Sequence, residues 1–265
     1  MVLMQAGLAS SVSLIDSLGP IHTSAYRLLY AAGIVTTVCL VRTGREMRRL
    51  FTIDTFLLGI AMAGMAIFFS IAIANMPLAV ATCIEFLGPL ALVCIYQKTA
   101  RSLMLVGGAL LGIYLMLVKT QDDRTATHIW SAFAAAVCWA GYIVLGKRIS
   151  LSDAGIFGIC PALLTAACTS LMIGACETGS SVGLVEAGEI LIITLLYPLG
   201  PYVLDLLALK SLKQSTFGML TSAEPVIALA IGIFTLGQTL SYVQVAGLSL
   251  VVFANAASLT ERNQS

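Results

Sequence analysis

Two stretches decide the fold: Ile84-Glu85-Phe86-Leu87-Gly88-Pro89 and Ser222-Ala223-Glu224-Pro225. Each sets a glutamate beside a proline deep within a long apolar run, and the two prolines lie 136 residues apart. An ionisable side chain at bilayer depth costs roughly 2.5 to 3.5 kcal/mol, so it is rare unless it faces a cavity, a partner or a pathway. Two such acids in proline-broken helices of a duplicated chain predict a transport site near the middle of a membrane.

The composition is that of an integral membrane protein. Apolar residues make up 59% of the 265 residues and charged residues only 10%, with a mean hydropathy of +0.98. The net charge of +1 provides no basic field for nucleic acid. The seven cysteines form no CxxC pair and have no histidine at metal-ligand spacing. We therefore expect no metal and no cofactor, and we expect partners in the lipid bilayer or across it.

A helix that spans a bilayer needs about 20 apolar residues. Ten such segments are predicted, at about 2–15, 22–41, 53–74, 77–97, 103–118, 127–147, 153–174, 187–209, 214–236 and 241–259. The first segment is short, and we expect the first helix to begin before Met1. The predicted fold class is all-α integral membrane, with ten transmembrane helices.

Positive residues gather on one side of the predicted membrane. In alternate loops, one side holds eleven lysines and arginines, whereas the other holds only Lys119 and Arg124. Because cytoplasmic loops carry the excess of positive residues, the first side is predicted to be cytoplasmic. That side includes the C-terminus.

The spans divide into two halves of five, residues 1–120 and 121–265. An odd number of spans forces the second half into the membrane upside down relative to the first. The loop Asn75-Met76-Pro77 carries no positive charge, whereas its equivalent, Lys210-Ser211-Leu212-Lys213, carries two. The pattern predicts two inverted five-helix repeats, with a transport site at the interface between them.

The glutamates are the first candidates for this site. Pro89 has no N–H to donate to the Glu85 carbonyl, so one turn carries a carboxylate and a free carbonyl that can bind an ammonium group or a proton. Pro225 frees the carbonyl of Thr221 beside Glu224 in the same way. The competing interpretation of each glutamate is a structural hydrogen bond to a neighbouring helix.

Asp205, Arg27, Trp139 and Tyr142 are further candidates. Asp205 follows two prolines that loosen the eighth span, and it lies nearer the cytoplasmic end, where a gating role competes with binding. The guanidinium of Arg27 can hold a carboxylate with two parallel hydrogen bonds, unless it snorkels to water at the outer face. Trp139 and Tyr142 can wall a cavity or merely pack between helices.

Three stretches resemble a known family: Glu85-Phe86-Leu87-Gly88-Pro89-Leu90-Ala91, Cys138-Trp139-Ala140-Gly141-Tyr142-Ile143, and Thr216-Phe217-Gly218-Met219-Leu220-Thr221-Ser222-Ala223-Glu224-Pro225. They resemble EamA-type members of the drug/metabolite transporter superfamily, most closely the bacterial threonine and homoserine exporter branch. The resemblance covers nearly the whole chain. It implies a ten-helix inner-membrane protein that exports small amino acids or related metabolites against an inward proton flow. Asp205 stands where a longer acid is expected in that branch.

The sequence thus predicts a secondary transporter, not an enzyme, in which Glu85 and Glu224 exchange a proton for the substrate's ammonium group. Arg27 would steer the substrate's carboxylate. Efflux of cationic drugs or metabolites is the first alternative, although only Phe86 and Phe217 are expected as aromatic lining near the acids. A sensor or scaffold without transport is the second. The substrate, the coupling ion and the oligomeric state stay open, with a homodimer among the options.

Overall fold

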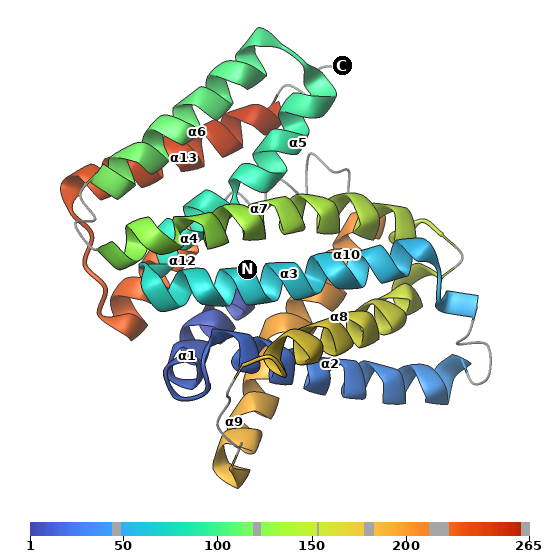
Figure 1. Ribbon diagram of the computed structural model, residues 1–265. Helices are drawn as coiled ribbons and strands as arrows, with labels where there is room; N and C mark the ends of the chain where they lie inside the picture. The colour runs from blue at the N-terminus through green and yellow to red at the C-terminus, as the bar shows by residue number, and fades with distance from the viewer. Residues whose placement is uncertain (44–48, 119–122, 153, 178–182, 212–222, 261–265) are drawn as a thin grey trace.

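The computed structural model describes residues 1–43, 49–118, 123–152, 154–177, 183–211 and 223–260, and every regular element in these ranges is helical (Figure 1). The α-helices are α1 (Val2–Leu18), α2 (Pro20–Thr43), α3 (Ile53–Asn75), α4 (Leu78–Glu85), α5 (Leu87–Gln97), α6 (Ala100–Val118), α7 (Asp123–Ser150), α8 (Ile159–Gly174), α9 (Leu184–Thr194), α10 (Gly200–Ser211), α12 (Glu224–Leu236) and α13 (Tyr242–Thr260). A 3-10 turn, Gly155–Gly158, precedes α8, and a π-helical turn, Leu195–Leu199, joins α9 to α10.

The helices confirm the all-α membrane class. In the part of the chain that the structure describes, seven helical stretches are long and apolar enough to cross a membrane: Pro20–Arg42, Ile53–Asn75, Leu78–Tyr96, Ala100–Val118, His128–Ser150, Gly155–Gly174 and Glu186–Ala208. The shorter apolar helices are Val2–Leu18, Glu224–Leu236 and Tyr242–Ala254. The arrangement of ten spans in an inverted repeat stays a prediction.

Two of the long stretches are interrupted beside prolines. α4 ends at Glu85 and α5 begins at Leu87, close to the point where Pro89 cannot donate a helical hydrogen bond. In the π-helical turn, Tyr197 leaves helical geometry, with φ −159° and ψ 123°, directly before Pro198. The kink predicted for the eighth span is therefore confirmed.

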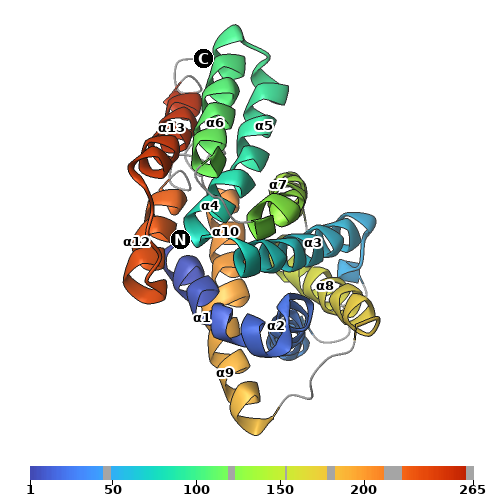
Figure 2. The same ribbon diagram turned by 60° about the vertical axis from the view of Figure 1, so that its left-hand side comes forward.

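The long helices pack in two groups (Figures 1 and 2). α3 packs along α7 and α8, and α2 along α8, whereas α6 pairs with α13. Between these groups, α12 contacts α1 and α4, and α10 contacts α7. Glycine permits the closest crossing of α6 and α13, because a methyl group on Gly112 or Gly247 would overlap the other residue's carbonyl oxygen.

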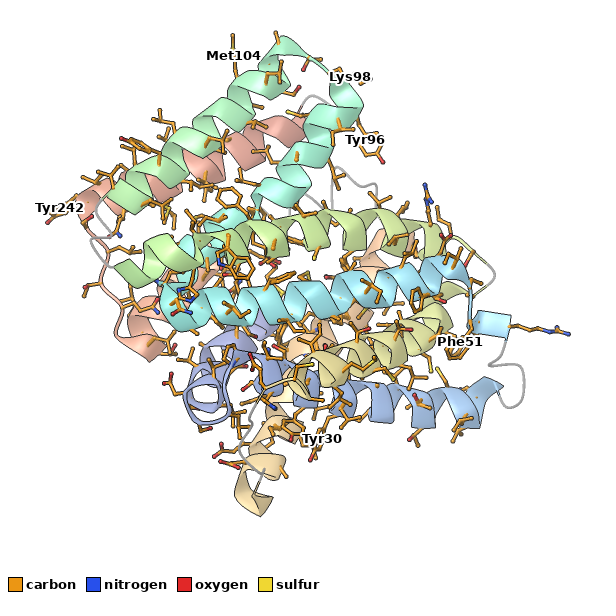
Figure 3. The ribbon with its side chains drawn as sticks, viewed as in Figure 1. Tyr30, Phe51, Tyr96, Lys98, Met104 and Tyr242 are labelled. Atoms are coloured by element: carbon orange, nitrogen blue, oxygen red, sulfur yellow. The ribbon has the colours of Figure 1, made fainter. Side chains whose placement is uncertain are left out.

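Large apolar side chains cover the outside of the molecule. Phe51, Tyr96, Met104 and Tyr242 point outward (Figure 3), and each exposes half or more of its surface. So many exposed large apolar side chains are unusual on a soluble monomer. It suits a chain whose outer surface is covered by lipid tails.

Candidate substrate site

Side chains from both halves of the chain line one buried cavity. Seven elements contribute: α1, α3, α4, α7, the π-helical turn, α10 and α12. The cavity has a volume of about 20 Å³. That volume holds one water molecule, whereas small-molecule sites commonly measure roughly 300 Å³ or more. The cavity therefore has room for a water molecule but not for an amino acid.

Glu85 enters the cavity from the end of α4. The side chain is only 6% exposed, and all eight residues of α4 are buried. A helix packed on every side cannot carry its terminal acid out to water. The carboxyl group is therefore held at depth by the packing of its own helix.

Glu224 enters the same cavity as the first residue of α12, with Pro225 directly after it. Proline is tolerated in the first helical turn because its missing N–H would have no intrahelical partner there. The N-terminus of a helix stabilises negative charge. Glu224 is 4% exposed, and its Oε2 atom has no hydrogen-bond partner among the described residues. That oxygen is free to accept a hydrogen bond from a ligand.

Asp205 completes a set of three carboxyl groups. It comes from α10 and lines the cavity together with both glutamates. All three carboxyl groups line the same small cavity. Like charges repel strongly in a medium of low dielectric constant, so the cavity favours a bound cation or protons shared among the acids.

Aromatic rings form much of the remaining wall. The lining rings are Phe69, Trp139, Tyr142, Tyr197 and Tyr202. Trp139 and Tyr142, for which the sequence left open a cavity wall or simple packing, both lie in this lining. The expectation of a site with few aromatic rings is wrong, because the kinked span adds Tyr197 and Tyr202 beside the acids.

The aromatic wall is internally packed. Phe86 lies behind the lining and meets the edge of the Trp139 ring, with the ring centroids 4.7 Å apart. The Tyr142 and Tyr202 rings lie 5.4 Å apart. Such pairs add about 0.5 to 1.5 kcal/mol beyond area burial, so the wall is a stable frame for the carboxyl groups.

Arg27 lies behind this wall, not in it. The side chain is 1% exposed, so the alternative in which it snorkels to water is wrong. Nη1 donates to the Ser11 hydroxyl at 2.6 Å and Nη2 donates to the Ser70 hydroxyl at 2.9 Å. The Cζ atom lies 5.0 Å from the centroid of the Tyr197 ring. The structure therefore places a buried cation one ring away from the three acids.

One predicted site residue cannot be placed, because Thr221 lies outside the residues that the structure describes. The contacts of Arg27 with Ser11, Ser70 and Tyr197 were not predicted from the sequence. The available signal was the position of Tyr197 directly before Pro198 in a span that two prolines loosen.

Comparisons with known proteins identify the family. The profile of the EamA-like transporter family matches residues 126–260. The threonine/homoserine exporter RhtA of Escherichia coli (strain K12) is 30% identical over 278 residues, which cover 100% of this chain and 90% of that protein. The chain belongs to the EamA-like transporter family.

Further likenesses agree with this EamA-like assignment. The exporter RhtA of Salmonella typhimurium (strain LT2) is also 30% identical, over 98% of this chain and 89% of that protein. A solved crystal structure with 20% identity superposes with a TM-score of 0.68, covering 97% of this chain and 95% of its own. At that identity, the match shows a shared fold alone.

Membership of the EamA-like family confirms two predictions. The chain is a transporter and not an enzyme. Together with the apolar helices, it also confirms a multi-pass membrane protein. The roles of Glu85, Asp205, Glu224 and Arg27 are the subject of the proposal that follows.

Proposed function

We propose that this EamA-like transporter is a secondary exporter, in the inner membrane of a bacterium, of small amino acids such as threonine and homoserine or of related metabolites. The observation that carries the proposal is the cavity shared by Glu85, Asp205 and Glu224. None of the described side chains that line it is basic, so it suits the ammonium group of an amino acid. The names of the relatives, which are threonine/homoserine exporters, support the substrate class.

Proton coupling would follow from competition for the same acids. Burial favours the neutral form of a carboxyl group, whereas a bound cation favours its charged form. Glu85 and Glu224 would therefore release a proton when the ammonium group binds and take one up when it leaves. Arg27 would hold the substrate's carboxylate, Trp139 and Tyr142 would wall the bound molecule, and Thr221 would add a hydroxyl.

The proposed mechanism is alternating access between two inverted repeats, residues 1–120 and 121–265. Helices at equivalent positions of the two halves pack against each other: α2 against α8, α4 against α12, and α6 against α13. Such pairing is expected where a pseudo-two-fold axis relates the halves. The small cavity supports an occluded step, and the charge difference between loops supports a cytoplasmic C-terminus.

Efflux of cationic drugs or metabolites is the second candidate, and the aromatic wall favours it. A cation over an aromatic face gains about 0.5 to 2 kcal/mol, and five rings line this cavity. The buried Arg27 is the feature that separates the candidates, because a cation without a carboxylate has no use for it. A sensor or scaffold without transport would not depend on any of these groups.

The test is efflux of labelled threonine and homoserine from bacterial cells that express the chain, under an imposed pH gradient. Gradient-driven efflux should be lost in Glu85→Gln and in Glu224→Gln, because a neutral amide cannot exchange a proton for an ammonium group. Glu189→Gln removes an exposed carboxylate and is the matched control.

The outcomes separate the candidates. Efflux of the amino acids that survives Glu189→Gln but not the buried substitutions supports the proposal. If a well-expressed parent exports only a hydrophobic cation such as tetraphenylphosphonium, the second candidate holds. If neither substrate moves, transport of these classes is rejected.

A further inference from the structure

Arg27 has hydrogen bonds but no charge partner. Its two terminal nitrogens donate to neutral serine hydroxyls, its Nε has no hydrogen-bond partner, and no carboxylate pairs with it among the described residues. A buried charge that is not compensated is costly. The guanidinium therefore keeps one N–H donor, at Nε, that no described residue accepts from.

The serines hold the guanidinium in place. Ser11 comes from α1 and Ser70 from α3, and Ser24 on the helix of Arg27 donates to the Ser70 hydroxyl at 2.8 Å. Three helices therefore fix the position of the cation. Only its immediate cover can change without separating those helices.

The Tyr197 ring covers one face of the guanidinium. It lies against the guanidinium, with Cζ 5.0 Å from the ring centroid, and it also lines the cavity of the three acids. The ring is therefore the partition between the buried cation and the buried acids. A carboxylate in the cavity would have to take the place of this ring to reach the face of the guanidinium that the ring covers.

The backbone geometry at Tyr197 favours displacement of its ring. The residue already has extended geometry inside a π-helical turn, and Pro198 has no N–H to lose from the helical ladder. A shift at such a break disturbs fewer helical hydrogen bonds than the same shift in a continuous helix.

We propose that the Tyr197 ring blocks access to Arg27, and that the carboxylate of the substrate displaces the ring from the guanidinium. The inference rests on the proposed function and adds a residue that determines specificity. A zwitterion uses the acids for its ammonium group and displaces Tyr197 with its carboxylate. An amine without a carboxylate leaves the ring in place, and the cavity stays small.

The experiment compares threonine with threoninol, which keeps the ammonium group and has an alcohol in place of the carboxylate. Titration calorimetry on the purified full chain gives the ratio of the two affinities. Arg27→Gln should lower the preference for threonine by at least roughly tenfold. Tyr197→Leu should raise it by roughly 3- to 30-fold, because the carboxylate no longer competes with a cation–π contact.

Three further variants make the test specific. Tyr197→Phe keeps an aromatic face and should shift the ratio less than Tyr197→Leu. Tyr114→Leu removes an exposed tyrosine on the outside of α6 and should leave the ratio unchanged. If Tyr197→Leu does not fold, Tyr197→Met fills the same space without a ring and carries the same expectation.

If Tyr197 has a purely structural role, its substitution would lower the affinities for threonine and threoninol equally and leave their ratio unchanged. That result would overturn the proposed role of Tyr197 and leave the proposal of threonine export intact. If the unsubstituted protein binds threoninol but not threonine, the blocking role of Tyr197 and the amino-acid substrate are both rejected. A ratio that rises in Tyr197→Leu and falls in Arg27→Gln supports the proposal.

Discussion

Each acid–proline segment brings a glutamate to the same cavity, but the two glutamates stand at opposite ends of their own helices. Glu85 is the last residue of α4, whereas Glu224 is the first residue of α12. When Pro89 and Pro225 are aligned at their offset of 136 residues, Glu224 falls on Gly88 and not on Glu85. The acid of the first half lies one helical turn earlier than that of the second.

Packing explains the difference. A methyl group on Gly88 would overlap the carbonyl oxygen of Ala136 in α7, so the first half has no room for a side chain at the position that Glu224 occupies in the second. The two acids also have different surroundings. Glu85 is in the last turn of α4, where a helix disfavours negative charge, whereas Glu224 is in the first turn of α12, where a helix favours it. The two glutamates of similar sequence motifs therefore stand at helix ends of opposite polarity.

Exchange assays in proteoliposomes can compare the roles of Glu85 and Glu224 directly. We expect the largest effect of all the predictions here, on threonine affinity. Because the N-terminus of α12 stabilises negative charge, Glu224 is the better partner for an ammonium group, and Glu224→Gln should lower threonine affinity by roughly 100-fold. Glu85→Gln should retain exchange of labelled for unlabelled threonine and lose only the response to a pH gradient.

The same assays can show that the two glutamates do not differ in function. If both substitutions abolish exchange and the gradient response to the same degree, the two environments are equivalent in function. Reconstitution of each variant to equal amounts, checked by its melting temperature in detergent, separates loss of function from loss of fold.

Much of the site could be predicted because a charge inside a membrane is conspicuous. Glu85, Glu224 and Asp205 stand out in apolar segments whatever the fold, since each needs a reason to be there. The three-residue spacing of Trp139 and Tyr142 sets them on one face of a helix. That Asp205 lines the same cavity as both glutamates was harder to predict, because the π-helical turn redirects the chain before it.

Tyr197, Ser11 and Ser70 could not be assigned from the sequence. Tyrosine and serine cost little in a membrane helix, so neither type marks a site by its presence. Their contacts with Arg27 depend on how α1, α3 and the π-helical turn cross. The approach of Gly88 to α7 is likewise a product of tertiary packing and leaves no local pattern.

Gly88→Ala tests whether packing sets the position of the acid in the first half. The added methyl group meets the backbone of Ala136, which cannot rotate away, so we expect about 1 to 3 kcal/mol of destabilisation from overpacking. Thermal unfolding in detergent measures it. Gly107→Ala is the matched control, because open space surrounds Gly107, and alanine there should stabilise the helix by about 0.5 to 1 kcal/mol. Equal melting temperatures for the two variants would rule out this packing explanation.

The prolines give the smallest expected effects and the finest comparison. Pro225 lies in the first turn of α12, where an N–H has no intrahelical partner, so Pro225→Ala should change stability by less than about 0.5 kcal/mol. Pro89→Ala supplies a donor to the Glu85 carbonyl and lets α4 run on into α5. We expect it to preserve or raise the melting temperature while slowing threonine export severalfold, because the continuous helix turns Glu85 away from Glu224. If Pro89→Ala and Pro225→Ala have the same effect on melting temperature and on the rate of threonine export, the helix break after Glu85 has no role of its own in transport.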